Sequence, residues 1–230
     1  MQALPTERGL KQLPLFRSRG PKHAAPLDVH AISIPARAFT GDFYFVRHAD
    51  DRFLFALGDV AGKGLNAAVV MAMIQEELER TSCDDPSADM MRLHTFLKPL
   101  IPLNRFATAV AGYVSDQGVV RLANAGHCPP IIVRADGSTE EISSTGPVLG
   151  VLSSSQWRTF ETTLNRGESL VLYSDGVIET TSKNGEEFGT GRLTAALNGN
   201  DSKAIAASVL QAVRHHGKTE DDLTLLVIRR

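Results

Sequence analysis

The order of its apolar patterns constrains the fold of this chain more than any other feature of the sequence. Patterns typical of β-strands mostly follow one another, and helical patterns come in two pairs. Successive strands joined by short connections form largely antiparallel sheets, and paired helices suit the outer faces of a two-sheet core. The sequence therefore predicts an α+β fold in which two largely antiparallel sheets are flanked by helix pairs.

Short-range patterns place the elements of this fold. The predicted strands are residues 28–34, 43–47, 53–58, 106–114, 118–123, 130–135, 158–164, 169–174 and 223–228. The predicted helices are residues 66–80, 88–100, 192–197 and 202–215. Two hairpins are expected, one joining the second and third strands and one joining the seventh and eighth. Residues 1–26 are proline-punctuated and mildly basic, which predicts an arm or linker before a single domain of residues 27–230.

Composition narrows the class of protein. With 230 residues, 43% of them hydrophobic, the chain can bury a sizeable core in one domain. A formal charge of -2 lacks the electrostatic footprint of a nucleic-acid-binding protein. The cysteines, Cys83 and Cys128, form neither a disulfide framework nor a metal-ligand spacing. No apolar run approaches the roughly 18 residues of a membrane span, and no signal-like apolar core opens the chain. We therefore expect a cytoplasmic protein.

Aspartates stand at the ends of four predicted strands. Asp42 precedes the strand at residues 43–47, and Asp59 follows its hairpin partner, so both lie at one end of the sheet. Asp175 follows the strand at residues 169–174, and Asp221 precedes the last strand. If those two strands also run antiparallel, the four carboxylates can converge on one rim.

A single aspartate at a strand end is usually a turn residue, but four of them favour a shared site. Clustered carboxylates without a cation repel one another, and some would hold protons at neutral pH. Ligation by oxygen alone suits Mg²⁺ or Mn²⁺ rather than zinc. The sequence therefore predicts a site for hard divalent cations on this rim.

Five motifs then carry a resemblance to a known family. They are Gly41-Asp42-Phe43-Tyr44, Gly58-Asp59-Val60-Ala61-Gly62-Lys63-Gly64, Ala123-Asn124-Ala125-Gly126-His127, Tyr173-Ser174-Asp175-Gly176-Val177-Ile178-Glu179 and Asp221-Asp222-Leu223-Thr224. In this order the series resembles the metal-dependent serine/threonine phosphatases (the PPM family), and more narrowly their bacterial SpoIIE and RsbU branch. The resemblance covers about residues 28–230.

The resemblance implies an αββα sandwich with two divalent cations, Mn²⁺ or Mg²⁺, at one end. It implies hydrolysis of phosphoserine or phosphothreonine on a signalling protein, often a STAS-type anti-sigma-factor antagonist in partner switching. Attack would come from a water that bridges the two cations. A second copy of the chain is kept open as a further partner.

The same resemblance implies the roles of individual residues. The implied metal ligands are the side chains of Asp42, Asp59, Asp175 and Asp221, together with the Val60 carbonyl. Asp222 is the alternative to Asp221, which is favoured as the first acid of the pair. The four aspartates are also the implied catalytic residues.

The chain also departs from the family pattern. Phe45 stands where many relatives carry another aspartate, and Ala61 replaces the histidine proposed as the general acid of eukaryotic relatives, so the general acid is unassigned. Relative to Asp42, Arg37 lies where eukaryotic relatives place a phosphate-binding arginine. A solvated arginine on the rim is an equal alternative. Lys63 fails the spacing of a nucleotide-binding phosphate loop. Asn124 is interpreted as a turn-stabilising residue and His127 as a hydrogen-bonded histidine, rather than as catalytic residues.

Two alternative functions remain open at this point. The chain can be a binding module that keeps the fold, has weak or no activity and captures a partner in either phosphorylation state. It can also be a metal-dependent phosphodiesterase or nuclease, although the near-neutral charge without a basic stripe disfavours that reading. The intact set of four aspartates favours the phosphatase.

Overall fold

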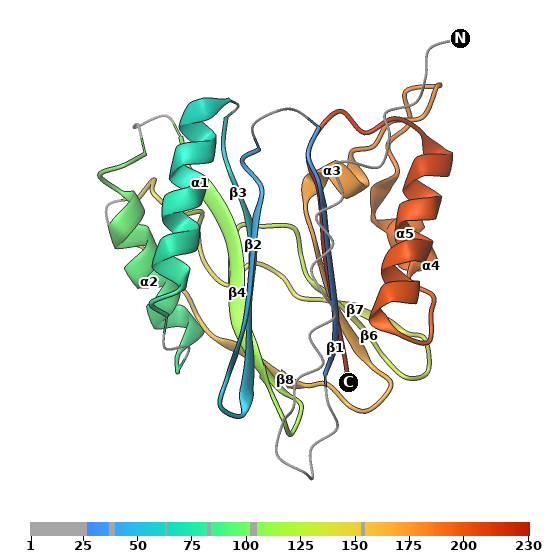
Figure 1. The fold of residues 1–230 in the computed structure, drawn as a ribbon, viewed down its shortest axis with the longest axis horizontal. Helices are drawn as coiled ribbons and strands as arrows, with labels where there is room; N and C mark the ends of the chain where they lie inside the picture. Colours follow the sequence, from blue (N-terminus) through green and yellow to red (C-terminus); the bar gives the residue numbers. More distant parts are fainter. Residues whose placement is uncertain (1–26, 37–39, 63, 82–83, 102–104, 153–154) are drawn as a thin grey trace.

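Two five-stranded antiparallel sheets packed face to face form the centre of the molecule (Figure 1). The structure is a computed structural model that describes residues 27–36, 40–62, 64–81, 84–101, 105–152 and 155–230. The first sheet has the order β2 (Phe43–Ala49), β3 (Arg52–Val60), β4 (Ala107–Ser115), β5 (Val119–Ala125) and β8 (Phe160–Thr163). The second has the order β1 (Asp28–Ile34), β10 (Leu223–Arg229), β9 (Ser169–Tyr173), β6 (Ile131–Val133) and β7 (Thr139–Glu141). The predicted arm lies outside the described residues.

Helices cover the outer face of each sheet, which completes the αββα sandwich predicted from the sequence. The helices α1 (Leu65–Leu78) and α2 (Pro86–Leu97) pack on the first sheet. The helices α4 (Gly189–Ala196) and α5 (Ser202–His216) lie on the outer face of the second, with the short α3 (Asp175–Ile178) at its upper end in Figure 1. Among the described helices, none combines the length and apolarity needed to cross a membrane.

Alternation along the strands divides the core into three layers. In β4, Ala109 and Ala111 face α1 and α2, whereas Val110 and Val114 face the second sheet. Across that interface lie Leu172 and other buried residues of β9 and β10. Fully burying one such large side chain is worth about 1.5–3 kcal/mol. Because both faces of the central strands are covered, these strands are apolar along most of their length.

The predicted hairpin between residues 158–164 and 169–174 is wrong. β8 pairs with β5 in the first sheet, while β9 pairs with β10 and β6 in the second. The connection crosses between the sheets, and it is held by the Glu168 carboxylate, which accepts from the Asn165 backbone N–H at 2.8 Å. A turn signal indicates where a strand ends, but it does not say whether the next strand pairs back. The exposed strand β7 and the short helix α3 were also absent from the sequence prediction.

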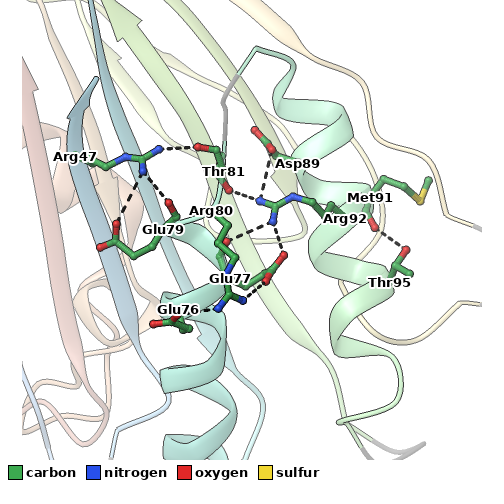
Figure 2. A network of polar contacts seen from close by, with 10 residues as sticks. All are labelled: Arg47, Glu76, Glu77, Glu79, Arg80, Thr81, Asp89, Met91, Arg92 and Thr95. Atoms are coloured by element: carbon green, nitrogen blue, oxygen red, sulfur yellow. Dashed lines mark hydrogen bonds and ion pairs between the residues drawn. The ribbon is translucent and has the colours of Figure 1, made fainter. Parts of the chain in front are cut away.

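The two ends of α1 are held differently. At its C-terminal end, the Arg92 guanidinium binds the Glu77 carboxylate and the Thr81 hydroxyl, and Arg47 donates to the Thr81 carbonyl at 2.6 Å (Figure 2). This network ties α1 to α2 and β2.

At the N-terminal end of α1, Gly64 supplies no side-chain cap, and the Leu65 side chain is 61% exposed. The end of α1 next to the Asp59 turn is therefore the less anchored one.

Candidate functional site

The hairpin of β2 and β3 carries the first half of the candidate site. Phe43 pairs with Gly58, so Asp42 and Asp59 lie one step beyond this pair at the same end of the sheet. A Cβ atom on Gly41 would lie 2.5 Å from Asp59 Oδ1 and 2.7 Å from the Val60 carbonyl oxygen. Only glycine leaves room there, so a carboxylate oxygen and a backbone carbonyl oxygen both lie close to the Gly41 backbone.

The antiparallel strands β9 and β10 carry the second half. The Ser174 backbone N–H donates to the Thr224 carbonyl at 2.9 Å, and the Ser174 hydroxyl accepts from the Thr224 N–H at 2.9 Å. Asp175 then begins α3. A Cβ atom on Gly176 would lie 2.1 Å from the Asp222 carbonyl oxygen, so α3 starts in direct contact with the segment that precedes β10.

One hydrogen bond joins the two halves across the interface between the sheets. The Thr224 hydroxyl, from the second sheet, donates to Asp42 Oδ2 at 2.6 Å. Asp42 is only 5% exposed, and the bond satisfies one oxygen of this buried carboxylate. Sequence reasoning missed Thr224 as a site residue. The signal that could have found it is strand alternation, because Thr224 shares the inter-sheet face with Leu226 and Ile228.

Burial and mutual repulsion make these carboxylates basic. Burial, with a smaller contribution from Asp59, raises the pKa of Asp42 to about 8, although the Thr224 hydrogen bond opposes the shift. Burial and the charges of Asp175 and Asp221 raise the pKa of Asp59 to about 7. Burial and Asp221 also raise the pKa of Asp175. The charges of Asp175 and Asp221 in the second half therefore lie close enough to disfavour the charged form of Asp59, which in turn disfavours that of Asp42.

The donor set fits a hard divalent cation, although the side chains are not arranged around one. The oxygens come from carboxylates and a backbone carbonyl, which Mg²⁺ and Mn²⁺ prefer. A bound cation would offset the burial and the repulsion that raise the pKa values of Asp42, Asp59 and Asp175. Within the described ranges, however, no group of three or more His, Cys, Asp or Glu side chains could hold an ion as it stands.

The two neighbouring acids before β10 differ in their surroundings. Asp222 is 8% exposed, and its Oδ1 accepts from the Ala36 backbone N–H at 2.7 Å, which anchors the segment after β1. Asp221 is half-buried on a bend, and its charge raises the pKa values of Asp59 and Asp175 more than that of Asp222 does. Asp221 thus remains the favoured candidate ligand, and Asp222 has a structural contact of its own.

The remaining residues singled out in the sequence lie elsewhere. Arg37 and Lys63 fall outside the described residues. Phe45 is buried in the core between the first sheet and its helices, on the face away from the second sheet. The backbone N–H of Ala61 donates to the Phe106 carbonyl at 2.9 Å, and its side chain offers no acid. Asn124 closes a turn around His127, accepting from the His127 backbone N–H at 2.8 Å.

Comparisons with known proteins agree with this fold. The family model of stage II sporulation protein E (SpoIIE) matches residues 49–230. The phosphoserine phosphatase RsbU of Bacillus subtilis is 29% identical over 228 residues, which span 95% of this chain and 68% of that protein.

Solved structures extend the comparison. The RsbU and RsbW domains of Rv1364c from Mycobacterium tuberculosis superpose with a TM-score of 0.76 at 26% identity, covering 89% of this chain and 61% of that one. RsbX, solved in complex with magnesium, has a TM-score of 0.69 at 18% identity, covering 88% and 94%, and shows the fold alone. The chain thus spans about two thirds of the length of the RsbU and Rv1364c chains it matches.

Proposed function

The chain belongs to the SpoIIE family of PPM-type phosphatases, and from this premise we propose that it hydrolyses phosphoserine or phosphothreonine on a signalling protein, with Mn²⁺ or Mg²⁺ as cofactor. The observation that carries the proposal is the convergence of Asp42, Asp59, Asp175 and Asp221 from two sheets onto one rim. The charges of Asp175 and Asp221, which flank strands of the second sheet, contribute to the raised pKa of Asp59 in the first sheet, as expected for carboxylates that share one rim.

The proposed ligands are these four carboxylates and the Val60 carbonyl, with Asp222 as the alternative to Asp221. Two divalent cations bound there would supply positive charge for the phosphoryl oxygens and lower the pKa of a water molecule. Of the relatives, RsbX has been solved with magnesium. Within this chain, the proposal is supported by a donor set made only of oxygen atoms. It is also supported by the raised pKa values of Asp42 and Asp59, which a bound cation would lower.

The protein residues near the rim favour direct hydrolysis over a covalent intermediate. Cys128 lies beside the site, but burial and the charges of Asp175 and Glu179 raise the pKa of its thiol to about 12, so it is no nucleophile at neutral pH. Burial lowers the pKa of His127 to about 4, so this imidazole cannot serve as a general acid. The remaining contribution of the chain is to hold Asp42 through Thr224 and to set the carboxylate spacing.

The proposed substrate is a phosphorylated STAS-type anti-sigma-factor antagonist in a partner-switching pathway. RsbU is named a phosphoserine phosphatase, and the Rv1364c structure contains an RsbU and an RsbW domain. These names support a role in signalling for a chain of the same family.

Hydrolysis of p-nitrophenyl phosphate and of a phosphorylated STAS-domain protein tests the proposal. We expect activity with Mn²⁺ or Mg²⁺, loss of activity with a chelator, and loss in Asp175→Ala but not in Asp136→Ala, a matched change in an exposed turn. Activity that survives thorough chelation or Asp175→Ala would contradict the metal-dependent mechanism. A wild-type chain that binds the phosphoprotein without hydrolysing it would identify a binding module instead.

A further inference from the structure

A turn closed by two side-chain hydrogen bonds holds the imidazole of His127 near the candidate site. At the end of β5, the Asn124 side chain accepts from the His127 backbone N–H at 2.8 Å and donates to the His127 carbonyl at 3.2 Å. Gly126 has a φ of 68°, and a Cβ atom there would lie 2.6 Å from the Val148 side chain. The backbone that carries His127 therefore has little freedom.

The His127 ring lies between the two sheets. The side chain is nearly buried, and its Nδ1 atom is 2.8 Å from the Thr108 hydroxyl of β4. Nε2 makes no hydrogen bond of normal geometry, although the backbone of Tyr173 in β9 is close enough to oppose the lowering of the His127 pKa. Tyr173 stands two residues before Asp175. The imidazole thus touches β4 on one side and approaches β9 on the other.

Thr108 leads from this ring to the first half of the site. It is the cross-strand partner of Asp59. Both side chains point into the space between the sheets, on the faces that carry Val110 and Leu57. The Cβ atoms of directly opposed residues are about 4.5–5.5 Å apart, so the Thr108 side chain lies against that of Asp59.

Cys128, the residue after His127, lies near both halves of the candidate site. The charges of Asp175 and Asp42 both contribute to the raised pKa of the Cys128 thiol. These two carboxylates belong to different sheets. The turn that carries His127 and Cys128 therefore lies near both sides of the rim.

We propose that His127 is a positioning residue, which holds the Thr108 side chain against Asp59 and sets the spacing between the Asp59 and Asp175 halves of the metal site. It touches neither substrate nor the reacting atoms. The inference rests on the proposed function, because it assumes that the rim binds divalent cations. The motif that contains His127, Ala123 to His127, contributes no metal ligand. The proposal gives this motif a positioning role.

Paired substitutions at Thr108 and His127 test this role. Thr108→Val keeps the shape and removes the hydroxyl, whereas Thr108→Ser keeps the hydroxyl and is the matched control. Loss of a residue that orients a metal ligand typically weakens metal affinity about 10–100-fold. We expect Thr108→Val to weaken Mn²⁺ binding about tenfold, read from the electron paramagnetic resonance signal of free Mn²⁺, and Thr108→Ser to bind as the wild type does.

Kinetics and a double substitution complete the test. At saturating Mn²⁺ we expect Thr108→Val to lower kcat for p-nitrophenyl phosphate with little change in KM. His127→Asn, which keeps a polar atom near the Nδ1 position, should bind Mn²⁺ better than His127→Leu. Thr108→Val combined with His127→Leu should be little worse than the poorer single variant, because the two residues act through one contact.

Two outcomes would overturn the proposal in distinguishable ways. Folded Thr108→Val protein with wild-type Mn²⁺ affinity and kcat would refute the role of His127 and leave the proposed function intact. Wild-type protein that binds no Mn²⁺ would refute the metal site and the positioning role together. Thr108→Val is conservative in shape, so the test stands even if the His127 variants do not fold.

Discussion

The two halves of the candidate site are built in different ways. Asp59 lies in β3 and Asp42 directly precedes β2, its hairpin partner, and the pKa values of Asp42 and Asp59 are raised to about 8 and about 7. Asp175 begins a helix of one turn, and Asp221 lies on a bend before β10. The first half thus lies in or directly beside a ladder of backbone hydrogen bonds, whereas the second depends on a short helix and a bend.

This difference suggests that the two halves have different roles in ion binding. A carboxylate that is buried in a sheet loses charge unless a cation compensates, so the first half should couple ion binding to stability. Carboxylates on a short helix and a bend can adjust their positions at lower energetic cost, so the second half should adapt the site to the ion. Four experiments test whether the two halves differ in this way.

The largest effect is expected from removing a proposed ligand of the first half. Asp59→Asn should lower the rate of p-nitrophenyl phosphate hydrolysis by at least about 10²–10³-fold, the loss typical of one preorganised electrostatic group. It should also stabilise the metal-free protein, because it removes a buried, repelled charge. Asp175→Asn should cost comparable activity with a smaller gain in metal-free stability. Equal gains in urea unfolding experiments with chelator would contradict the comparison.

The pH dependence of metal-free stability should come mainly from the first half. The folded-state pKa of Asp42 is raised to about 8, so the folded state binds more protons than the unfolded state above pH 4. Stability should therefore fall as the pH rises from about 4 through about 8. One pKa unit corresponds to about 1.4 kcal/mol, so the change amounts to several kcal/mol.

Urea unfolding from pH 5 to 8 with chelator, compared between wild type and Asp42→Asn, measures this slope. The difference between the two proteins should shrink toward low pH, where Asp42 is protonated. Subtracting the variant's curve removes the contributions of other titrating groups, including His94, whose pKa is lowered by burial. A difference that is constant with pH would show that Asp42 is not the source.

Gly41→Ala should disturb the first half without changing its charges. The new methyl group would lie 2.5 Å from Asp59 Oδ1 and 2.7 Å from the Val60 carbonyl oxygen, which belongs to the backbone. Overpacking of this kind costs about 1–3 kcal/mol, and the displaced oxygens should also bind Mn²⁺ more weakly. Gly191→Ala in α4 is the control, because no atom lies within 4 Å of the added group. Thermal unfolding and Mn²⁺ titration measure both effects.

The smallest effect should separate the two acids of the second half. Asp221→Asn should weaken Mn²⁺ binding about tenfold with little change in stability. Asp222→Ala should instead lower stability by about 1.5–3 kcal/mol, because the Ala36 N–H loses its charged acceptor. The reverse pattern in calorimetry would assign the ligand role to Asp222.

Much of the fold was predictable because strand and helix periodicities are local. The hairpin of β2 and β3, and with it the placement of Asp42 beside Asp59, follows from two apolar runs and a short turn. The error at β8 and β9 has the same origin. The patterns of β8 and β9 are equally local, but strand pairing depends on which sheet has a free edge. β8 pairs with β5 at the edge of the first sheet.

The layer architecture, the family and the types of residue on the rim can be predicted from the sequence, because periodicity and motif order are properties of neighbouring residues. How the two halves meet depends on the packing of the two sheets. The hydrogen bond from Thr224 to Asp42 joins residues 182 positions apart, and the contact between His127 and Thr108 joins two strands through a turn. Such contacts depend on how two sheets pack, and no local pattern encodes that packing.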